Sequence, residues 1–565
     1  MTQKTAKLHA ARRAAEVGEP LPRHGWRRAV AVYPSPYEVA MSNLGYQWLF
    51  HALASAGLGV ARAVWPDAAL LAEVERDTLR AIDDDRAAAD ADVWFVSLSF
   101  ENDLVRFAEL LRLAGLAPRA AARDDAAPLI VAGGVVPMLN PEPTAALADV
   151  CLLGEGEAVL RPFLDYLRDH DPARREDFLA GLRDLPGAYV GRYYQSRYAA
   201  DGRLLAVEAR GGFPARVAVP KEARFDPLLT RLHLRAPSAA FGDTLLIETA
   251  RGCVNRCRFC AAGHLFLPFR PASPPASLPR LGEDALGLVG SNVSGHPELE
   301  RWIAAADGRR VTLSSIRRGA LSDAQWARLT AAALAAAALA PEAGTARLRA
   351  VVNKPATDKE ILAEVARAAA ASIRNIKLYY LIGLPTETAE DRVAIVELTQ
   401  RCRDAAMVGW KAKGRAGKII ASVNPFIPKP QTPFQWHPYG DPAERQKQLA
   451  DLRNKLRPLP NVEMQSESPR EAVLQALLSL GDRRTADLAL RVAEAGNIQR
   501  GLKAWRPDYL ALLTAQREFG DCLPWDHLDI GVRRDYLEKE YENALAGKTS
   551  PPCNLGHRCR LCGAC

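Results

Sequence analysis

The 565-residue sequence has no long hydrophobic run and few cysteines for its length. Its longest apolar run, Ala331–Ala340, is about half of a membrane span and ends at Pro341, so we expect no membrane-spanning helix. Ten cysteines in a chain of this size are too few for a disulfide framework. Aromatic residues make up only 7%, but the 48% hydrophobic and 25% charged residues exclude a disordered or collagen-like chain.

The first 26 residues lack the apolar stretch of a secretory signal. They are basic and rich in alanine and arginine, which is compatible with a transit peptide, but we expect a flexible tail on a cytoplasmic protein. Cysteines in that compartment stay reduced and are free to bind metal. The net charge of +8, from 74 Lys and Arg against 66 Asp and Glu, permits an anionic partner without indicating one.

Residues 27–186 alternate between short buried-strand patterns and helical stretches. The expected strands are Ala29–Tyr33, Val93–Ser99, Leu129–Ala132 and Val150–Leu153, and Asn43–Ala56 is an expected helix. Strands separated by helices predict an α/β domain with a doubly wound, flavodoxin- or Rossmann-like parallel sheet. Ligands of such sheets bind beyond the carboxyl ends of the strands.

The remaining chain divides into four segments. Residues 187–240 are a connector with an expected hairpin around Asp201-Gly202, and residues 241–440 form a second α/β unit. Its expected strands are Leu245–Glu248, Leu286–Val289, Val311–Ser314, Ile376–Leu381 and Lys418–Val423, with Ala331–Ala340 read as a packed crossover helix. Residues 441–550 are helical, clearest over Arg445–Leu456 and Arg470–Leu480, and residues 551–565 are a cysteine cluster.

Three cysteines follow the first strand of the second α/β unit, at Cys253, Cys257 and Cys260. Three thiolates on one loop cannot close a tetrahedral zinc site alone. They can bind three irons of a four-iron cluster and leave the fourth iron open to a small molecule. A zinc knuckle completed by His264 is the structural alternative.

This spacing, with Phe259 in the aromatic position, resembles the signature of the radical S-adenosylmethionine (SAM) superfamily. The resemblance implies a (β/α)6 partial barrel and a catalytic [4Fe–4S] cluster on the three cysteines. SAM would bind the open iron, and one-electron reduction would cleave it to methionine and a 5′-deoxyadenosyl radical. It also implies an electron donor such as a flavodoxin or ferredoxin.

Further segments match the family in order. Pro341–Thr345 with Asn353-Lys354 resembles the pattern at the fourth strand, Gly383–Thr388 the turn after the fifth, and Asn424–Trp436 the segment after the sixth. The candidate SAM contacts are Phe259, Ser314, Glu342 and Gly344. Many members hold the SAM amino group with Gly-Gly-Glu after the second strand, where this chain has 290–295, Gly-Ser-Asn-Val-Ser-Gly.

The N-terminal sheet ahead of such a barrel resembles the cobalamin-binding domain of the B12-dependent radical SAM branch. The chain has no Asp-x-His-x-x-Gly, so a histidine ligand to cobalt from that motif is excluded. A sheet kept for packing or for substrate binding is the alternative. The matching residues at the strand ends are Ser97, Ser99, Gly133, Gly134, Gly154, Glu155 and Gly156.

Four further cysteines lie within thirteen residues at the end of the chain. They predict a second iron–sulfur cluster or a zinc site, in which His557 could replace one ligand. Cys151, Cys402 and Cys522 are isolated, and ordinary burial is expected for each. The four candidate ligands are Cys553, Cys559, Cys562 and Cys565.

The whole chain resembles a group of B12-domain radical SAM proteins that share Leu523–Asp526 and the cysteine tail. The resemblance favours methylation of an unactivated carbon, with cobalamin as the methyl carrier, but it supplies no substrate. A radical rearrangement, a cyclisation or a methylthiolation fed by the tail cluster is the second hypothesis. A maturation or RNA-associated factor with a zinc-binding tail is the third, since Arg483-Arg484 and nearby aromatic residues could contact RNA.

Overall fold

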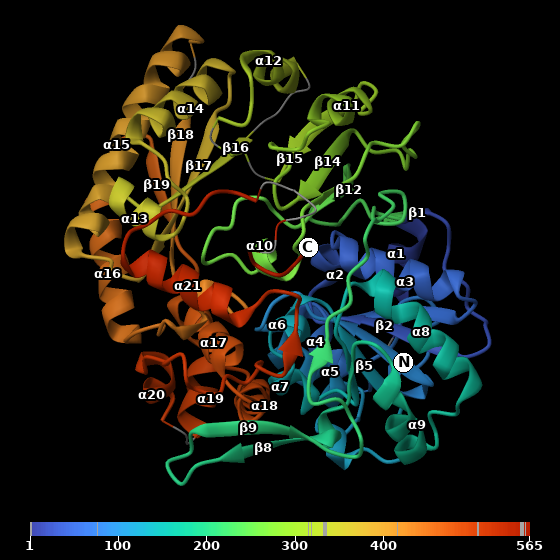
Figure 1. Cartoon of the computed structure of the whole chain (residues 1–565). Helices are drawn as coiled ribbons and strands as arrows, with labels where there is room; N and C mark the ends of the chain where they lie inside the picture. Colours follow the sequence, from blue (N-terminus) through green and yellow to red (C-terminus); the bar gives the residue numbers. More distant parts are fainter. Residues whose placement is uncertain are drawn as a thin grey trace.

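The computed structural model shows an N-terminal sheet domain, an arc of strands and a C-terminal helical region (Figure 1). The arc crosses the top of the view, with the N-terminal domain at the lower right and the last helices at the lower left. The structure describes residues 3–75, 77–314, 316–317, 319–331, 336–414, 416–505, 508–553, 559 and 561–565.

The N-terminal sheet has the strand order β3-β2-β4-β5-β6-β7. Its first five strands are parallel and β7 is antiparallel. This is the 2-1-3-4-5 order of a flavodoxin-like sheet, which confirms the predicted doubly wound domain. The strands are β2 (Arg28–Tyr33), β3 (Gly59–Val64), β4 (Val93–Ser97), β5 (Leu129–Gly133), β6 (Val150–Leu152) and β7 (Ala188–Tyr189).

Helices follow most of these strands. The Asn43 side chain caps α3 by accepting a hydrogen bond from the Tyr46 backbone N–H at 2.9 Å, which fixes where that helix begins. The helices are α2 (Tyr37–Ala40), α3 (Leu44–Ser55), α4 (Ala68–Val74), α5 (Asp103–Leu113), α6 (Val135–Leu139), α7 (Glu142–Ala145), α8 (Gly156–Asp169) and α9 (Arg175–Gly181).

The expected flexible N-terminal tail is wrong for the residues that the structure describes. They form α1 (Gln3–Ala15) and β1 (Val17–Gly18), and β1 pairs with β11 (Leu234–Arg235). Both terminal nitrogens of the buried Arg62 guanidinium lie 2.8 Å from the Glu16 carboxylate. A buried cation needs a partner of opposite charge, so this contact holds the N-terminal segment on the sheet domain.

The connector contains the predicted hairpin, which is confirmed as β8 (Tyr194–Tyr198) and β9 (Leu204–Ala209). A further strand, β10 (Val217–Ala218), pairs in parallel with β20 (Leu528–Asp529) near the end of the chain. The connector is therefore attached to the C-terminal region as well as to the two domains that it joins.

The second α/β unit is confirmed as a partial barrel. Six parallel strands follow in chain order and β19 adds a seventh, while the short β13 pairs antiparallel at the edge. A hydrogen bond of 3.1 Å from Ile316 N to Ala338 O links its two four-stranded sheets. The strands are β12 (Thr244–Arg251), β13 (Arg270–Pro271), β14 (Ala285–Gly290), β15 (Arg310–Leu313), β16 (Ala336–Glu342), β17 (Asn375–Ile382), β18 (Lys418–Pro425) and β19 (Val462–Gln465).

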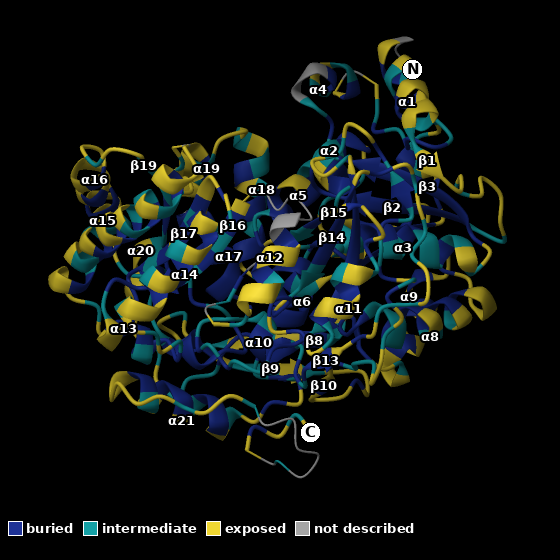
Figure 2. Ribbon diagram, turned by 90° about the horizontal axis from the view of Figure 1, so that it is seen from above, coloured by how far each residue is buried: buried dark blue, intermediate teal, exposed yellow. Residues whose placement is uncertain are grey.

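Helices cover the outer face of the arc, and their outward sides are exposed (Figure 2). In Figure 2 this exposure is plain on α11 and α12. The barrel helices are α10 (Ala262–Leu265), α11 (Leu299–Ala304), α12 (Asp323–Ala331), α13 (Ala346–Val351), α14 (Asp358–Ala370) and α15 (Ala389–Ala412).

The alanine-rich run does not form the predicted crossover helix. Residues 332–335 lie outside the described residues, and Ala336–Glu342 is strand β16, paired in parallel with β17. Its buried residues alternate, as at Ala337 and Leu339, which is the period of a strand. The high helix propensity of alanine is a weak preference that pairing within a sheet overrides.

The C-terminal region is helical, as predicted. No helix among the described residues is long and apolar enough to span a membrane. The helices are α16 (Pro442–Leu456), α17 (Pro469–Leu480), α18 (Thr485–Ala495), α19 (Ile498–Ala504), α20 (Tyr509–Thr514) and α21 (Arg534–Leu545).

Candidate active site between the two sheets

A cavity of about 510 Å³ lies between the N-terminal sheet and the barrel. Ser97, Gly133 and Leu152 line it from the carboxyl ends of β4, β5 and β6. Ala250 and Gly290 line it from the ends of β12 and β14. Parallel sheets bind ligands at this edge, and here the binding edges of two sheets face one space.

The loops that the sequence singled out in the N-terminal domain gather at this cavity, with one difference. Ser99 belongs to a separate network, in which its hydroxyl accepts hydrogen bonds from Tyr33 Oη at 3.2 Å and Asn43 Nδ2 at 3.3 Å. The residues that line the cavity are Ser97, Gly133, Gly134, Gly154, Glu155 and Gly156.

The glycines of these loops serve different purposes. A Cβ on Gly134 would lie 2.3 Å from Leu98 O, and one on Gly156 would lie 2.3 Å from the Trp48 ring. Internal packing therefore requires glycine at both positions. A Cβ on Gly133 would meet nothing closer than Leu152 O at 3.8 Å, so only there among these three does the protein leave room for a ligand to approach.

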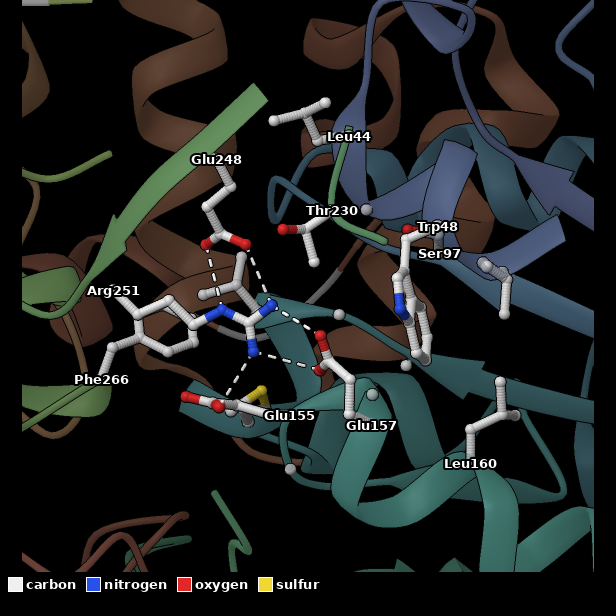
Figure 3. Close-up of a pocket in the computed structure, with 18 of the residues that line it drawn as sticks. Leu44, Trp48, Ser97, Glu155, Glu157, Leu160, Thr230, Glu248, Arg251 and Phe266 are labelled. Carbon is white, nitrogen blue, oxygen red and sulfur yellow. Dashed lines mark hydrogen bonds and ion pairs between the residues drawn. The ribbon is translucent and has the colours of Figure 1, made fainter. Parts of the chain in front are cut away.

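Arg251, at the end of β12, carries the central charge of the cavity wall (Figure 3). Its guanidinium lies 2.7 Å from Glu157 Oε1, 3.0 Å from Glu155 Oε2 and 3.0 Å from Glu248 Oε2. Glu155 and Glu157 belong to the N-terminal domain and Glu248 to the barrel. Arg251 therefore joins the two domains at the edge of the cavity.

A second arginine of the barrel, Arg270, also binds Glu155, with nitrogen–oxygen distances of 2.5 and 2.8 Å. Burial raises the pKa of the Glu155 carboxyl, but Arg270 and Arg251 outweigh it, so the pKa lies below its ordinary value. Burial, with the nearby Glu157 and Glu155 carboxylates, raises the pKa of Glu248 although Arg251 lowers it. Glu155, proposed from the sequence as a cofactor contact, thus serves first as an ion-pair partner between domains.

The cysteine loop begins where β12 ends. Gly252 has a φ of +71°, and a Cβ there would lie 2.3 Å from Phe266 O, so the turn into the loop requires glycine. Gly252 and Phe266 also line the cavity, which places the loop that carries Cys253 at its margin. Phe259 packs against the core and does not line the cavity.

The three thiols influence one another electrostatically. Burial raises the pKa of Cys257 to about 12, Lys354 lowers it, and the Cys260 and Cys253 thiols raise it again. Among the described residues, no three His, Cys, Asp or Glu side chains are yet arranged to hold a metal ion. The donor set fits a cluster, because bound metal replaces the thiol protons and draws the thiolates together.

Glu342 and Lys354 form an ion pair beside the loop, with Oε1 and Nζ 2.8 Å apart. Lys354 is close enough to Cys257 to lower its pKa, so the predicted SAM contact Glu342 lies near the thiols. Gly344 is explained by packing, because a Cβ there would lie 2.5 Å from Ile395 N in α15. Ser314 lines the cavity and donates a hydrogen bond to Gly290 O at 3.3 Å.

The segment that replaces Gly-Gly-Glu reaches the cavity through Gly290 and Ser291. The Ser294 hydroxyl is committed elsewhere, because it accepts a hydrogen bond from Arg317 N at 2.8 Å. Gly290 and Ser291 are thus the members of this segment that are placed to contact a ligand.

The arginines considered for RNA contact bind the protein itself. Arg483 pairs with Glu142 at 2.8 Å, and Arg484 pairs with Asp482 at 2.6 Å while stacking 4.0 Å from the Tyr198 ring centroid. Trp505 is buried. These contacts give the two arginines a structural role.

The remaining cysteines separate into two kinds. Cys151 and Cys402 are buried and Cys522 is half-buried. Cys553, Cys559, Cys562 and Cys565 are described, whereas His557 lies outside the described residues.

Several residues of the site were not predicted from the sequence. Trp48 and Leu44 of α3 stand on the cavity wall, as do Glu248 and Arg251 of β12. The position of Arg251, two residues before Cys253, is the one signal that the sequence offers for this set.

Two family patterns match the chain. The pattern described as radical SAM proteins, N-terminal, matches residues 45–191, and the pattern of the radical SAM superfamily matches residues 247–399. The uncharacterized protein MJ0966 of Methanocaldococcus jannaschii is 26% identical over 403 residues, covering 69% of this chain and 78% of that protein.

Two structures of the cobalamin-dependent SAM radical enzyme OxsB resemble this chain, with low TM-scores and low sequence identity. The form with aqua-cobalamin gives a TM-score of 0.44 at 13% identity, covering 82% of this chain and 67% of that one. The form with aqua-cobalamin and SAM gives 0.41 at 15% identity, covering 66% of this chain and 52% of that one. The chain thus spans about half the length of that second structure.

The matched barrel region contains the three-cysteine loop at the end of the first barrel strand, and the matched N-terminal region contains strands β3 to β7 of the sheet that faces it across the cavity. The chain therefore belongs to the radical SAM superfamily.

Proposed function

We propose that this radical SAM protein is a cobalamin-dependent enzyme that methylates an unactivated carbon. The observation that carries the proposal is the shared cavity, because the cobalamin-type loops of one sheet and the SAM-type strands of the other open into the same space. Its volume, about 510 Å³, lies within the usual range for a pocket that binds one drug-sized molecule.

Cys253, Cys257 and Cys260 would bind the four-iron cluster, and Glu342 with Lys354 would border the SAM site. Ser97 and Gly133 would contact cobalamin, with Trp48 as an apolar wall. Cluster and SAM supply a carbon-centred radical, and cobalamin supplies a methyl group; the protein orients them and excludes water. The buried Arg251 and Arg270 ion pairs fix the two domains around them.

Anaerobic reconstitution with iron, sulfide and cobalamin tests this proposal. We expect about four irons for the catalytic cluster and about one cobalt per chain. Transfer of an isotope-labelled methyl group from SAM into a candidate substrate would then follow by mass spectrometry. A protein that binds the cluster but no cobalt contradicts the cobalamin part, and one that binds neither contradicts the whole.

One alternative has an observation in its favour. The backbone N–H of Cys553 donates a hydrogen bond of 2.7 Å to Val254 O, inside the catalytic cysteine loop. A second metal centre on the tail would therefore lie beside the first, as a methylthiolation fed by an auxiliary cluster requires. The mass of the product, methyl or methylthio, separates the two reactions.

A further inference from the structure

The end of the chain lies against the catalytic cysteine loop, beside α10 in Figure 1. The 2.7 Å hydrogen bond from Cys553 N to Val254 O joins them directly. Asn353 joins them again, because its Nδ2 donates to Arg256 O at 3.1 Å and its Oδ1 accepts from Ser550 N at 2.9 Å. We call the described residues at this end of the chain, 548–553, 559 and 561–565, the C-terminal strap.

Arg258, between two of the catalytic cysteines, is the buried anchor of this contact. Its Nε lies 3.0 Å from Glu540 Oε2 in α21, and one terminal nitrogen lies 2.8 Å from Lys548 O in the strap. The other donates to Val351 O, at the end of α13, at 2.9 Å. One fully buried guanidinium thus fixes the loop, the last helix and the start of the strap together.

Two of the strap cysteines are held by backbone hydrogen bonds, Cys553 to the catalytic loop and Cys562 to the segment before α21. Cys562 is buried, and its carbonyl oxygen accepts a hydrogen bond of 2.8 Å from Arg533 N.

A buried arginine, Arg256, lies in the loop that the strap contacts. Arg256 is only 3% exposed, its guanidinium lies 5.6 Å from the Tyr536 ring centroid, and its Nε has no hydrogen-bond partner among the described residues. Metal-bound thiolates in the strap would give this cation a partner of opposite charge.

We propose that the four strap cysteines bind a second, thiolate-ligated metal centre that clasps the strap over the catalytic loop and protects the catalytic cluster. The role of the clasp rests on the proposed function, since it assumes a cluster on that loop. Four thiolates fit zinc or an iron–sulfur cluster, and both would close the strap in the same way.

The test uses the full-length chain, reconstituted without oxygen, and a Cys559→Ser/Cys562→Ser variant. A Cys522→Ser variant is the control, because Cys522 is half-buried and outside the strap. We expect the double variant to lose the second metal, zinc or iron, and to keep about four irons on the catalytic loop. We also expect its remaining cluster to bleach several-fold faster in air than in the wild type or in the control.

Amide hydrogen exchange of the peptide over residues 253–260 gives a readout that needs no catalytic cluster. Removing the strap metal should speed exchange of this peptide, whose Arg258 N–H bonds to Val352 O at 3.1 Å. The proposal is overturned if wild type and double variant bind equal metal, or if metal is lost while bleaching and exchange stay unchanged. Failure of the proposed function is a different result: no cluster on Cys253, Cys257 and Cys260, with the strap metal still bound.

Discussion

Arg258 Nε lies 3.0 Å from Glu540 Oε2, so a residue between two catalytic cysteines is paired with the final helix of the chain. Both side chains are buried. The pair spans 282 positions of sequence, and it makes the C-terminal region part of the structure that holds the catalytic loop.

Replacing Arg258 with Met should strongly destabilise the protein. The change leaves Glu540 buried without its cation, and breaking a buried ion pair from one side costs about 3–5 kcal/mol. Denaturant unfolding measures the loss, and iron content should fall with it.

Two further variants serve as comparisons for the stability loss in Arg258→Met. Arg112→Met removes a half-exposed ion pair with Glu75 and should cost less than about 1 kcal/mol. Arg258→Met/Glu540→Leu removes both buried charges and should recover part of the loss. A loss no larger for Arg258→Met than for Arg112→Met would show that the buried pair does not hold the loop.

The glycines of the N-terminal loops distinguish packing from ligand binding. Gly156→Ala places a Cβ 2.3 Å from the Trp48 ring and should cost about 1–3 kcal/mol, which Gly156→Ala/Trp48→Leu should reduce. Gly133→Ala meets only an ordinary contact at 3.8 Å, so stability should stay about unchanged while cobalamin affinity falls. Thermal unfolding and equilibrium titration with cobalamin measure the two effects. Unchanged affinity in Gly133→Ala would place cobalamin elsewhere.

His527 should make the protein less stable at acidic pH. It is buried against the Tyr189 and Tyr194 rings, neither ring nitrogen has a partner among the described residues, and burial lowers its pKa to about 4. Glu142 raises this pKa and Arg483 lowers it. Between pH 6.5 and pH 4 the unfolded chain binds a proton that the folded chain excludes, so stability falls as pH falls.

The contribution is at most about 1.4 kcal/mol per pH unit in that window. His527→Phe removes it, while every other histidine stays in place. Urea unfolding from pH 7 to pH 5 should therefore give a shallower decline for the variant than for the wild type. Parallel declines would show that His527 binds its proton over the same pH range in the folded protein as in the unfolded chain.

Contiguous features could be predicted from the sequence, whereas contacts between distant residues could not. The cysteine loop and the strands of 129–133 and 375–382 carry local signals, a fixed spacing or a run of branched apolar residues. The sequence of strand β16 predicts a helix, because its alanines favour helices until a neighbouring strand pairs with them. The pairing of Arg251 with Glu155 follows from the way two domains pack, and no periodicity encodes it.

The production of 5′-deoxyadenosine and methionine from SAM under a strong reductant tests the central claim most directly. The wild-type protein, reconstituted with about four irons on the catalytic loop, should form both products, and Cys257→Ala should form neither. A reconstituted wild type that leaves SAM intact, or a Cys257→Ala variant that cleaves it as fast, would contradict the account.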